Sequence, residues 1–290
     1  MAIGKSNRSE RYRIRAVERA LLLLKTFLGN DSDLSATEIG KRLELDPSTT
    51  FRMLVTLEEH GFVRQDPSSG KYHLGVICLE LGSQFLKNND TRRSSLDVMQ
   101  YLRDQFGETV HLGILDGSEI VYLEKVAGSR AIGLMSSRVG GRAPANATGI
   151  GKVLLAHLSQ DELRARFPRL KLPRCTDTTI TDWQAFEKEM ARVRENGYAI
   201  DDQEFEAGVK CVAAPVYGHK GIVAALSISA PIERMEEHIK KQGLIEAIKQ
   251  ASVQISTESG WGRGVDQIGK SPVSQPSMNR KTKSHRSIEI

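Results

Sequence analysis

Four side chains between Pro47 and His60 have the types and spacing of a helix face that meets DNA. They are hydroxylated or cationic and recur at helical spacing: Ser48, Thr49, Arg52 and Thr56. Hydroxyls near a helix N-terminus can hydrogen-bond phosphates, and an arginine can bridge the two acceptors of a guanine in the major groove. The same pattern also suits an ordinary solvated helix face, so the neighbouring elements must decide between the two interpretations.

The residues around this face predict two short helices joined by a tight turn. Ser35 and Glu38 form an S-x-x-E capping box, which starts a supporting helix at Ala36. Asp46 followed by Pro47 starts a second helix, because aspartate caps a helix and proline fits its first position. The second helix is expected to pack inward through its larger apolar residues, Phe51, Leu54 and Leu57.

A hairpin is predicted directly after the second helix. Gly61 ends the helix, residues 62–64 begin a strand, and the turn residues at 66–70 lead to a returning strand at 71–74. A helix followed at once by a hairpin indicates a winged helix-turn-helix. Its wing is expected to offer three side chains to DNA: Arg64, Lys71 and Tyr72.

Apolar helices are predicted on both sides of this motif. In the helix at Val17–Leu28, one set of residues is expected to cover the helix-turn-helix core: Leu21, Leu24 and Leu28. A second set is surplus apolar surface that dimerisation would bury: Leu22, Leu23 and Phe27. A linker helix follows at Val76–Leu86, and the polar residues 87–90 mark a domain boundary.

The rest of the chain alternates strands and helices. Hairpins are predicted at 109–126 and 212–229, with a further strand at Ala131–Ser136, a helix at 94–106 and a single long helix from Ile232 to Ser256. Further helices are expected near 149–157, 160–167 and 183–196. Consecutive hairpins with helices indicate an antiparallel sheet covered by helices, in the mixed α/β class and specifically α+β.

Two groups of residues in this second domain could bind a small ligand. Residues 145–152 lead from a loop into an apolar helix, so the amide groups at Gly149 and Ile150 could hold a carboxylate. The motif is not a P-loop, because Val153 follows the lysine where Ser or Thr is required. The other group is Asp201, Cys211, Ser227 and Ser229, in which the two serines alternate onto one strand face. The alternative interpretation is that the glycines serve packing, that Cys211 is a small buried hydrophobic residue, and that the serine hydroxyls bond to the backbone.

The chain resembles the IclR-type bacterial transcriptional regulators. The resemblance is carried by Leu34–Gly75, containing SATEIGKRLELDPSTTFRMLVTLEEHGFVRQDPSSGKYHLG, and then by TVHLGILDGSEIVYLEKV, ATGIGKVLLA, GYAIDDQEFEAGVKCVAAPV and AALSISAP in the family's order. It covers roughly Arg15 to Gly260. It implies a DNA-binding domain and a GAF-like effector-binding domain. The effector pocket that it implies comprises Gly149, Ile150, Asp201, Cys211, Ser227 and Ser229, with Leu134 and Met135 as apolar walls.

The function expected from these features is transcriptional regulation of a catabolic operon, with repression favoured over activation. The expected partners are double-stranded operator DNA, a small organic-acid effector and further copies of the chain, as a dimer or tetramer. No catalytic site, metal or cofactor is expected. One alternative is a cysteine-dependent enzyme or redox sensor using Cys211, although nearby Asp201 would disfavour a thiolate. Another is a structural nucleic-acid-binding protein, which leaves the second domain unexplained.

Composition agrees with a two-domain globular chain. The 290 residues are 39% hydrophobic and 27% charged, and no apolar run suits a membrane span or a signal peptide, so a cytoplasmic location without membrane attachment is expected. The net charge of +5 lies mostly at the two ends, so it is not itself an argument for DNA binding. The expected divisions are a basic arm (1–14), the winged domain (15–75), the linker helix (76–90), the effector domain (91–260) and a disordered tail (261–290).

Overall fold

The computed structural model describes residues 12–29, 31–130, 137–219 and 221–261. Within these residues the chain divides into two compact units, one ending at Arg93 and the other beginning at Ser94. None of the described helices is both long and apolar enough to cross a membrane. The strand expected at Ala131–Ser136, and with it Leu134 and Met135, lies outside the described residues.

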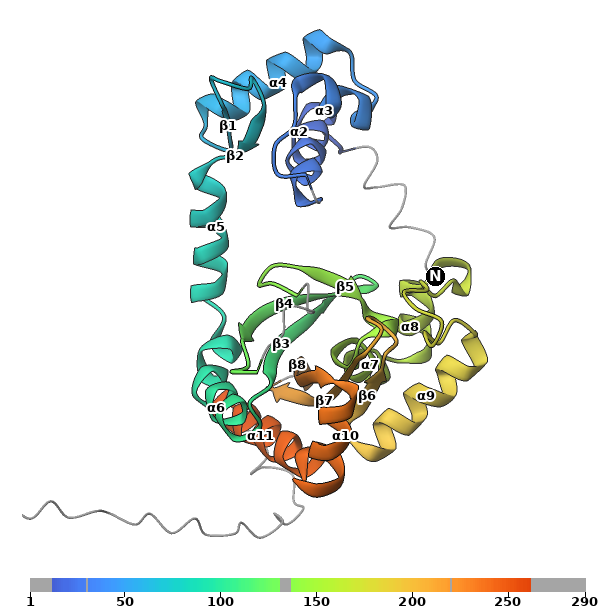
Figure 1. Cartoon of the computed structure of the whole chain (residues 1–290). Coiled ribbons are helices and arrows are strands. Elements are labelled where there is room, and N and C mark those ends of the chain that lie inside the picture. Colours follow the sequence, from blue (N-terminus) through green and yellow to red (C-terminus); the bar gives the residue numbers. More distant parts are fainter. Residues whose placement is uncertain (1–11, 30, 131–136, 220, 262–290) are drawn as a thin grey trace, which may run out of the picture. The chain divides into compact units, whose positions relative to one another are not determined.

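The first unit is a winged helix-turn-helix (Figure 1). Its elements are α2 (Arg15–Lys25), η1 (Thr26–Leu28), α3 (Ala36–Leu43), α4 (Pro47–Glu59), β1 (Val63–Gln65), β2 (Tyr72–Leu74) and α5 (Val76–Lys87). The capping box before α3 is formed, and the Asp46 side chain accepts a hydrogen bond from the Thr49 amide at 2.8 Å. Strands β1 and β2 pair antiparallel, with Val63 opposite Leu74. The wing therefore follows the second helix of the motif directly.

The core of the first unit corrects two expectations about which residues face inward. Leu23 and Phe27, expected to be surplus, are buried, whereas Leu21 and Leu28, expected in the core, are exposed. Leu24 packs against the core and Leu22 is exposed, as expected. In α4, Phe51 is 57% exposed and Thr50 is buried instead, with its hydroxyl donating to the Asp46 carbonyl at 3.0 Å. The remaining core residues are Leu34, Ile39, Leu54, Val63 and Tyr72.

The second unit is built on a six-stranded antiparallel sheet in the order β5-β4-β3-β8-β7-β6. The strands are β3 (Thr109–Asp116), β4 (Glu119–Val126), β5 (Arg142–Pro144), β6 (Ala199–Asp202), β7 (Val209–Gly218) and β8 (Gly221–Pro231). The two hairpins expected from the sequence, β3–β4 and β7–β8, are joined because β3 pairs with β8. This central pairing brings residues more than 110 positions apart into direct register, with His111 opposite Ser227.

Helices cover both faces of this sheet (Figure 1). The helices of this unit are α6 (Asp90–Phe106), α7 (Gly149–Ala156), α8 (Gln160–Arg166), α9 (Trp183–Asn196), α10 (Ile232–Lys241) and α11 (Leu244–Glu258), with short turns η2 (Ala145–Ala147) and η3 (Pro168–Leu170). Helices α7, α10 and α11 pack directly on the strands, and α9 packs on α7. The single long helix expected from Ile232 is two helices. Gly243 separates them with a φ of 64°, a left-handed conformation that glycine adopts without steric cost.

Candidate functional site

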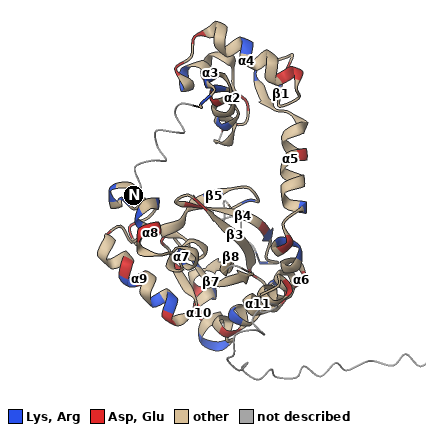
Figure 2. Cartoon of the chain, turned by 180° about the vertical axis from the view of Figure 1, so that it is seen from behind, with Lys and Arg blue, Asp and Glu red and all other residues tan. Residues whose placement is uncertain are grey.

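The outer face of α4 and the wing carry the side chains expected to meet DNA. Ser48, Arg52 and Thr56 are exposed on α4, Thr49 is half-buried, and Arg64 and Lys71 are exposed on the hairpin. The three basic side chains form no ion pair with any carboxylate in the described part of the chain, whereas Arg42 on α3 is paired with Asp31. Figure 2 shows the basic residues along these helices. Unpaired guanidinium and ammonium groups on one surface are available to phosphates and base edges.

Tyr72 is a correction to the expected DNA-contacting set. Its side chain is only 2% exposed and belongs to the core of the first unit. The cause is backbone pairing, because Tyr72 bridges to Leu34 through hydrogen bonds of 3.0 and 2.8 Å, and this turns its ring inward. A buried ring has no surface to offer to DNA.

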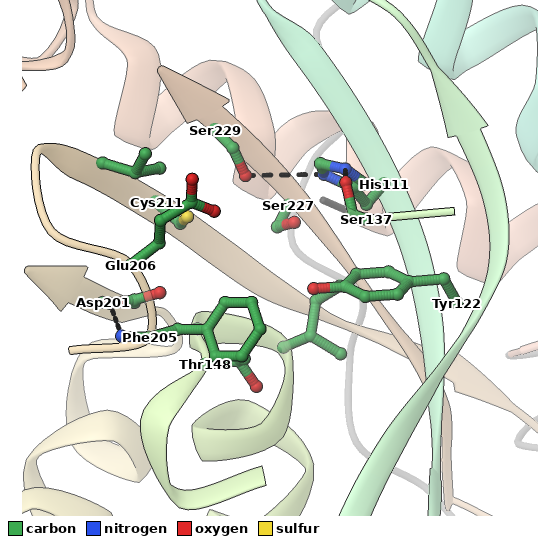
Figure 3. Close-up of a pocket in the computed structure, with 13 residues that line it drawn as sticks. His111, Tyr122, Ser137, Thr148, Asp201, Phe205, Glu206, Cys211, Ser227 and Ser229 are labelled. Carbon is green, nitrogen blue, oxygen red and sulfur yellow. Dashed lines mark hydrogen bonds between the residues drawn. The ribbon is translucent and has the colours of Figure 1, made fainter. Parts of the chain in front are cut away.

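A cavity lies between the sheet of the second unit and the start of α7 (Figure 3). Strands β3, β4, β6, β7 and β8 all contribute to its wall. Its lining residues are His111, Tyr122, Ser137, Thr148, Gly149, Ile150, Asp201, Phe205, Glu206, Val209, Cys211, Ser227 and Ser229. All six described residues of the expected pocket therefore line one cavity.

Strand register explains why the expected polar residues converge. Asp201 on β6 lies opposite Cys211 on β7, and Cys211 lies opposite Ser229 on β8, so these three residues form a row across three strands. Ser227 lies two residues from Ser229 on the same strand face and opposite His111 on β3. Side chains in register on one face of a sheet point the same way, and here they point toward α7.

The start of α7 supplies hydrogen-bond donors to the same cavity. The Thr148 side chain caps the helix by accepting from the Gly151 amide at 3.1 Å. The amides of Gly149 and Ile150 have no hydrogen-bond partner among the described residues. Gly151 has a packing role, since a Cβ there would lie 2.1 Å from the Ala145 carbonyl oxygen. Lys152 is not at the cavity. It is buried, donates to the Ile200 carbonyl at 3.0 Å and pairs with Glu204.

The two carboxyl groups of the cavity, Asp201 and Glu206, have raised pKa values. Burial raises the pKa of Asp201 to about 7, although its carboxylate accepts hydrogen bonds from the amides of Glu204 at 2.8 Å and Phe205 at 3.3 Å. Burial also raises the pKa of Glu206, against the opposing effect of Lys125. Among the described lining residues there is no lysine or arginine. A carboxylate ligand would therefore depend mainly on amide and hydroxyl donors, because the neighbouring cation, Lys125, is not among the lining residues and donates to the Ser137 carbonyl at 2.6 Å.

The cysteine of the cavity is unsuited to nucleophilic or redox chemistry. Burial and the neighbouring Asp201 raise the pKa of the Cys211 thiol well above its usual value. His111 is also unsuited to act as a general base for Cys211. Burial and, secondarily, Lys125 lower its pKa to about 3, and both of its ring nitrogens contact serine hydroxyls. Those contacts are 2.9 Å to Ser137 and 3.4 Å to Ser229. A thiol that stays protonated is a weak nucleophile, which removes the physical basis of the enzyme alternative.

Sequence reasoning missed seven residues of the cavity wall: His111, Tyr122, Ser137, Thr148, Phe205, Glu206 and Val209. The pairing of β3 with β8 brings in His111, and no local pattern announces that pairing. The sequence contains only a weak indication that Glu206 lines the cavity, namely its position five residues before Cys211 in a short turn-like segment. The enclosed space is small, about 30 Å³. Ligand pockets usually measure about 300–1,000 Å³, so the lining must separate to admit an organic molecule.

Comparisons with known proteins match both units. Residues 16–67 match the family model "IclR helix-turn-helix domain", and residues 83–257 match "Bacterial transcriptional regulator IclR C-terminal". The chain is 39% identical over 249 residues to the HTH-type transcriptional regulator XynR of Escherichia coli K12, covering 86% of this chain and 98% of that protein. It is 34% identical over 247 residues to the HTH-type transcriptional repressor AllR of Salmonella typhi, covering 84% and 90%.

A solved structure gives the same result for the fold. The crystal structure of an IclR homolog from Microbacterium hydrocarbonoxydans, complexed with 4-hydroxybenzoate, aligns with a TM-score of 0.73 and 27% identity. The alignment covers 84% of this chain and 98% of that one. The two sequence relatives are transcriptional regulators, and the solved structure is an IclR homolog.

Proposed function

Because the chain belongs to the IclR family of bacterial transcriptional regulators, we propose that it represses a catabolic operon until a small organic acid binds its second unit. DNA binding and effector control are properties of the family. Repression is supported by the similarity to AllR, a named repressor. The DNA contacts proposed here are Ser48, Thr49, Arg52, Thr56, Arg64 and Lys71, without Tyr72. We further propose that the regulator acts as a dimer or higher oligomer, because helices α2 and α5 carry exposed apolar side chains that association would bury.

The observation that carries the effector assignment is the meeting of the α7 N-terminus with the polar row of the sheet. The free amides of Gly149 and Ile150 are suited to hold a carboxylate, helped by the hydroxyls of Ser227 and Ser229. Asp201 is suited to hydrogen-bond a ligand hydroxyl, as an acceptor when ionised and as a donor when protonated. The 4-hydroxybenzoate bound by the Microbacterium protein has both groups, a carboxylate and a hydroxyl.

The charge of the cavity restricts the effector further. The described lining residues that can carry a charge near neutral pH, Asp201 and Glu206, are acidic, His111 stays neutral because its pKa is lowered to about 3, and no lysine or arginine is among them. A second negative group on the ligand would meet carboxylates in a poorly hydrated site, where repulsion is strong. The proposed effector is therefore a hydroxylated monocarboxylate rather than a dicarboxylate or a phosphorylated acid.

Two measurements test this function. Fluorescence anisotropy with promoter fragments from the genes beside its own should show tight binding, with a dissociation constant on the order of nanomolar to micromolar. Random DNA should be a poor competitor for this binding. Calorimetry should then show binding of a hydroxylated monocarboxylate, with D-gluconate and 4-hydroxybenzoate as first probes and 6-phosphogluconate as the matched doubly acidic control. Tighter binding of 6-phosphogluconate than of gluconate would contradict the charge argument.

A further inference from the structure

A groove runs between α2 and α4 in the first unit, beside the face proposed to enter the major groove. Its volume is about 530 Å³. One wall comes from α2 and the other from α4, and the lining residues are Arg15, Ala16, Arg19, Ala20, Thr49, Arg52, Met53, Thr56 and Leu57. The small side chains of Ala16 and Ala20 leave the floor open between the two helices.

Charge along this groove is of one sign. Arg15 and Arg19 lie one helical turn apart and are exposed, and Arg52 faces them from α4. Among the described residues none of the three arginines forms an ion pair, and no aspartate or glutamate lines the groove. Arg13, just before α2, differs in both respects, because it pairs with Glu18 at 3.3 Å and lies outside the groove. Three unpaired guanidinium groups close together repel each other unless an anion lies between them.

We propose that this groove binds the sugar-phosphate backbone of one operator strand, at the edge of the major groove that α4 enters, with Arg15 and Arg19 binding its phosphates. The proposal rests on the DNA-binding function proposed above. The major groove is about 12 Å wide and accepts one helix of about 10–12 Å diameter, so when α4 occupies it, side chains from α2 meet the backbone at its edge. Guanidinium groups bind phosphate oxygens in a bidentate manner, and the Thr49 hydroxyl adds an uncharged contact, whereas the Thr56 hydroxyl already donates to the Arg52 carbonyl at 2.9 Å. Arg52 borders both surfaces, so the test relies on Arg15 and Arg19.

The experiment measures affinity against salt concentration for an operator duplex and a random duplex of equal length. The variants are Arg15→Ala, Arg19→Ala and their combination, with Arg13→Ala as the matched control on the same part of the chain. Each lost phosphate contact lowers the salt slope by about 0.9, so the double variant should lose about 1.8 from the slope. Between about 50 and about 200 mM salt, the wild-type affinity should therefore fall about 12-fold more than that of the double variant. Operator and random DNA should be affected alike, and Arg13→Ala should keep the wild-type slope.

Several results would overturn the proposal. A double variant that keeps the wild-type slope would show that no phosphate is bound in the groove. Loss on the operator alone would make Arg15 and Arg19 base readers, and a change in oligomeric state measured by light scattering would assign the groove to a protein contact. Circular dichroism melting checks that the variants fold. Arg19→Lys keeps the positive charge, so its salt slope should be closer to that of the wild type than the slope of Arg19→Ala. If the wild-type chain bound no DNA, the regulator function itself would fail, whereas an unchanged slope in a DNA-binding chain overturns only this inference.

Discussion

Effector binding should weaken as the pH rises, because Asp201 must hold a proton next to a carboxylate ligand. Burial gives this group a pKa of about 7 in the free protein. A bound carboxylate adds negative charge and raises that pKa further, so the complex carries more protons than the free protein. Effector affinity is therefore independent of pH below the Asp201 pKa of the free protein. It falls as the pH rises from that value to the higher Asp201 pKa of the complex.

The size of the effect follows from the sheet. Asp201 and Ser229 are two strands apart, and neighbouring strands are separated by about 4.8 Å, so a carboxylate at Ser229 lies about 10 Å from Asp201. At an effective dielectric constant of about 20, charges about 10 Å apart repel by about 1.7 kcal/mol, equivalent to about 1.2 pKa units. We therefore expect roughly a tenfold loss of affinity between about pH 6 and about pH 9.

Calorimetry in two buffers of different ionisation enthalpy measures both the affinity and the proton taken up. Asp201→Asn should remove most of the dependence, whereas Asp202→Asn, at an exposed neighbour on β6 that pairs with Lys210 at 3.0 Å, should keep it. His111 stays neutral over this range because its pKa is about 3. Glu206 also has a raised pKa and would contribute with the same sign, so the Asn variant is needed to separate the two. Proton release on binding, or a full pH dependence in Asp201→Asn, would refute the reasoning.

Four further outcomes are expected. Arg52→Ala should cost about 1–3 kcal/mol at the operator and relax base preference, while Lys71→Ala should weaken operator and random DNA alike in anisotropy; equal losses for Arg52→Ala would reassign it to phosphate. Combined Ser227→Ala and Ser229→Ala should weaken effector binding by roughly 0.5–1.5 kcal/mol per lost hydrogen bond in calorimetry, with unchanged operator affinity without effector; full-strength binding would reject the pocket. Tyr72→Ala should lower the free energy of unfolding in urea by about 3–5 kcal/mol, and Tyr72→Phe should leave DNA affinity intact; lost DNA binding in a Tyr72→Phe variant of normal stability would argue against a purely structural ring. Footprinting should reveal pseudo-palindromic half-sites about 34–36 Å apart, and tight binding of a monomer to one half-site would oppose this.

Local chemistry allowed much of the fold to be predicted. The capping box at Ser35 and the Asp46–Pro47 start act within four residues, and both helices begin where these signals place them. The strand at Glu119–Val126 and the helix at Trp183–Asn196 also have the predicted bounds. Such elements are fixed by caps, turns and periodicity, which are all readable in a short window.

The errors arose where tertiary packing chooses between similar residues. Helix α2 has leucines at four consecutive positions, so periodicity could not tell that Leu23 rather than Leu21 faces the core. Tyr72 turned inward because of its bridge to Leu34, which is distant in sequence. In the cavity, Asp201 and Cys211 were candidates from their strand positions and were assigned to the pocket by the family resemblance. His111 was missed because it reaches the cavity through the β3–β8 register.

The junction between the wing and α5 behaves as a stiff mechanical coupling. A Cβ at Gly75 would lie 2.0 Å from the Gly61 carbonyl oxygen, and the Cys78 thiol contacts the Phe62 carbonyl at 3.4 Å, so the first turn of α5 is pressed onto the end of α4. The 12 residues of α5 extend about 18 Å from this clamp. If the C-terminal end of α5 at Lys87 moved, we expect α4 to rotate with it, because the close contacts at Gly75 leave no room for the chain to bend there. Any residue larger than glycine at position 75 would collide with the Gly61 carbonyl and should therefore loosen this coupling.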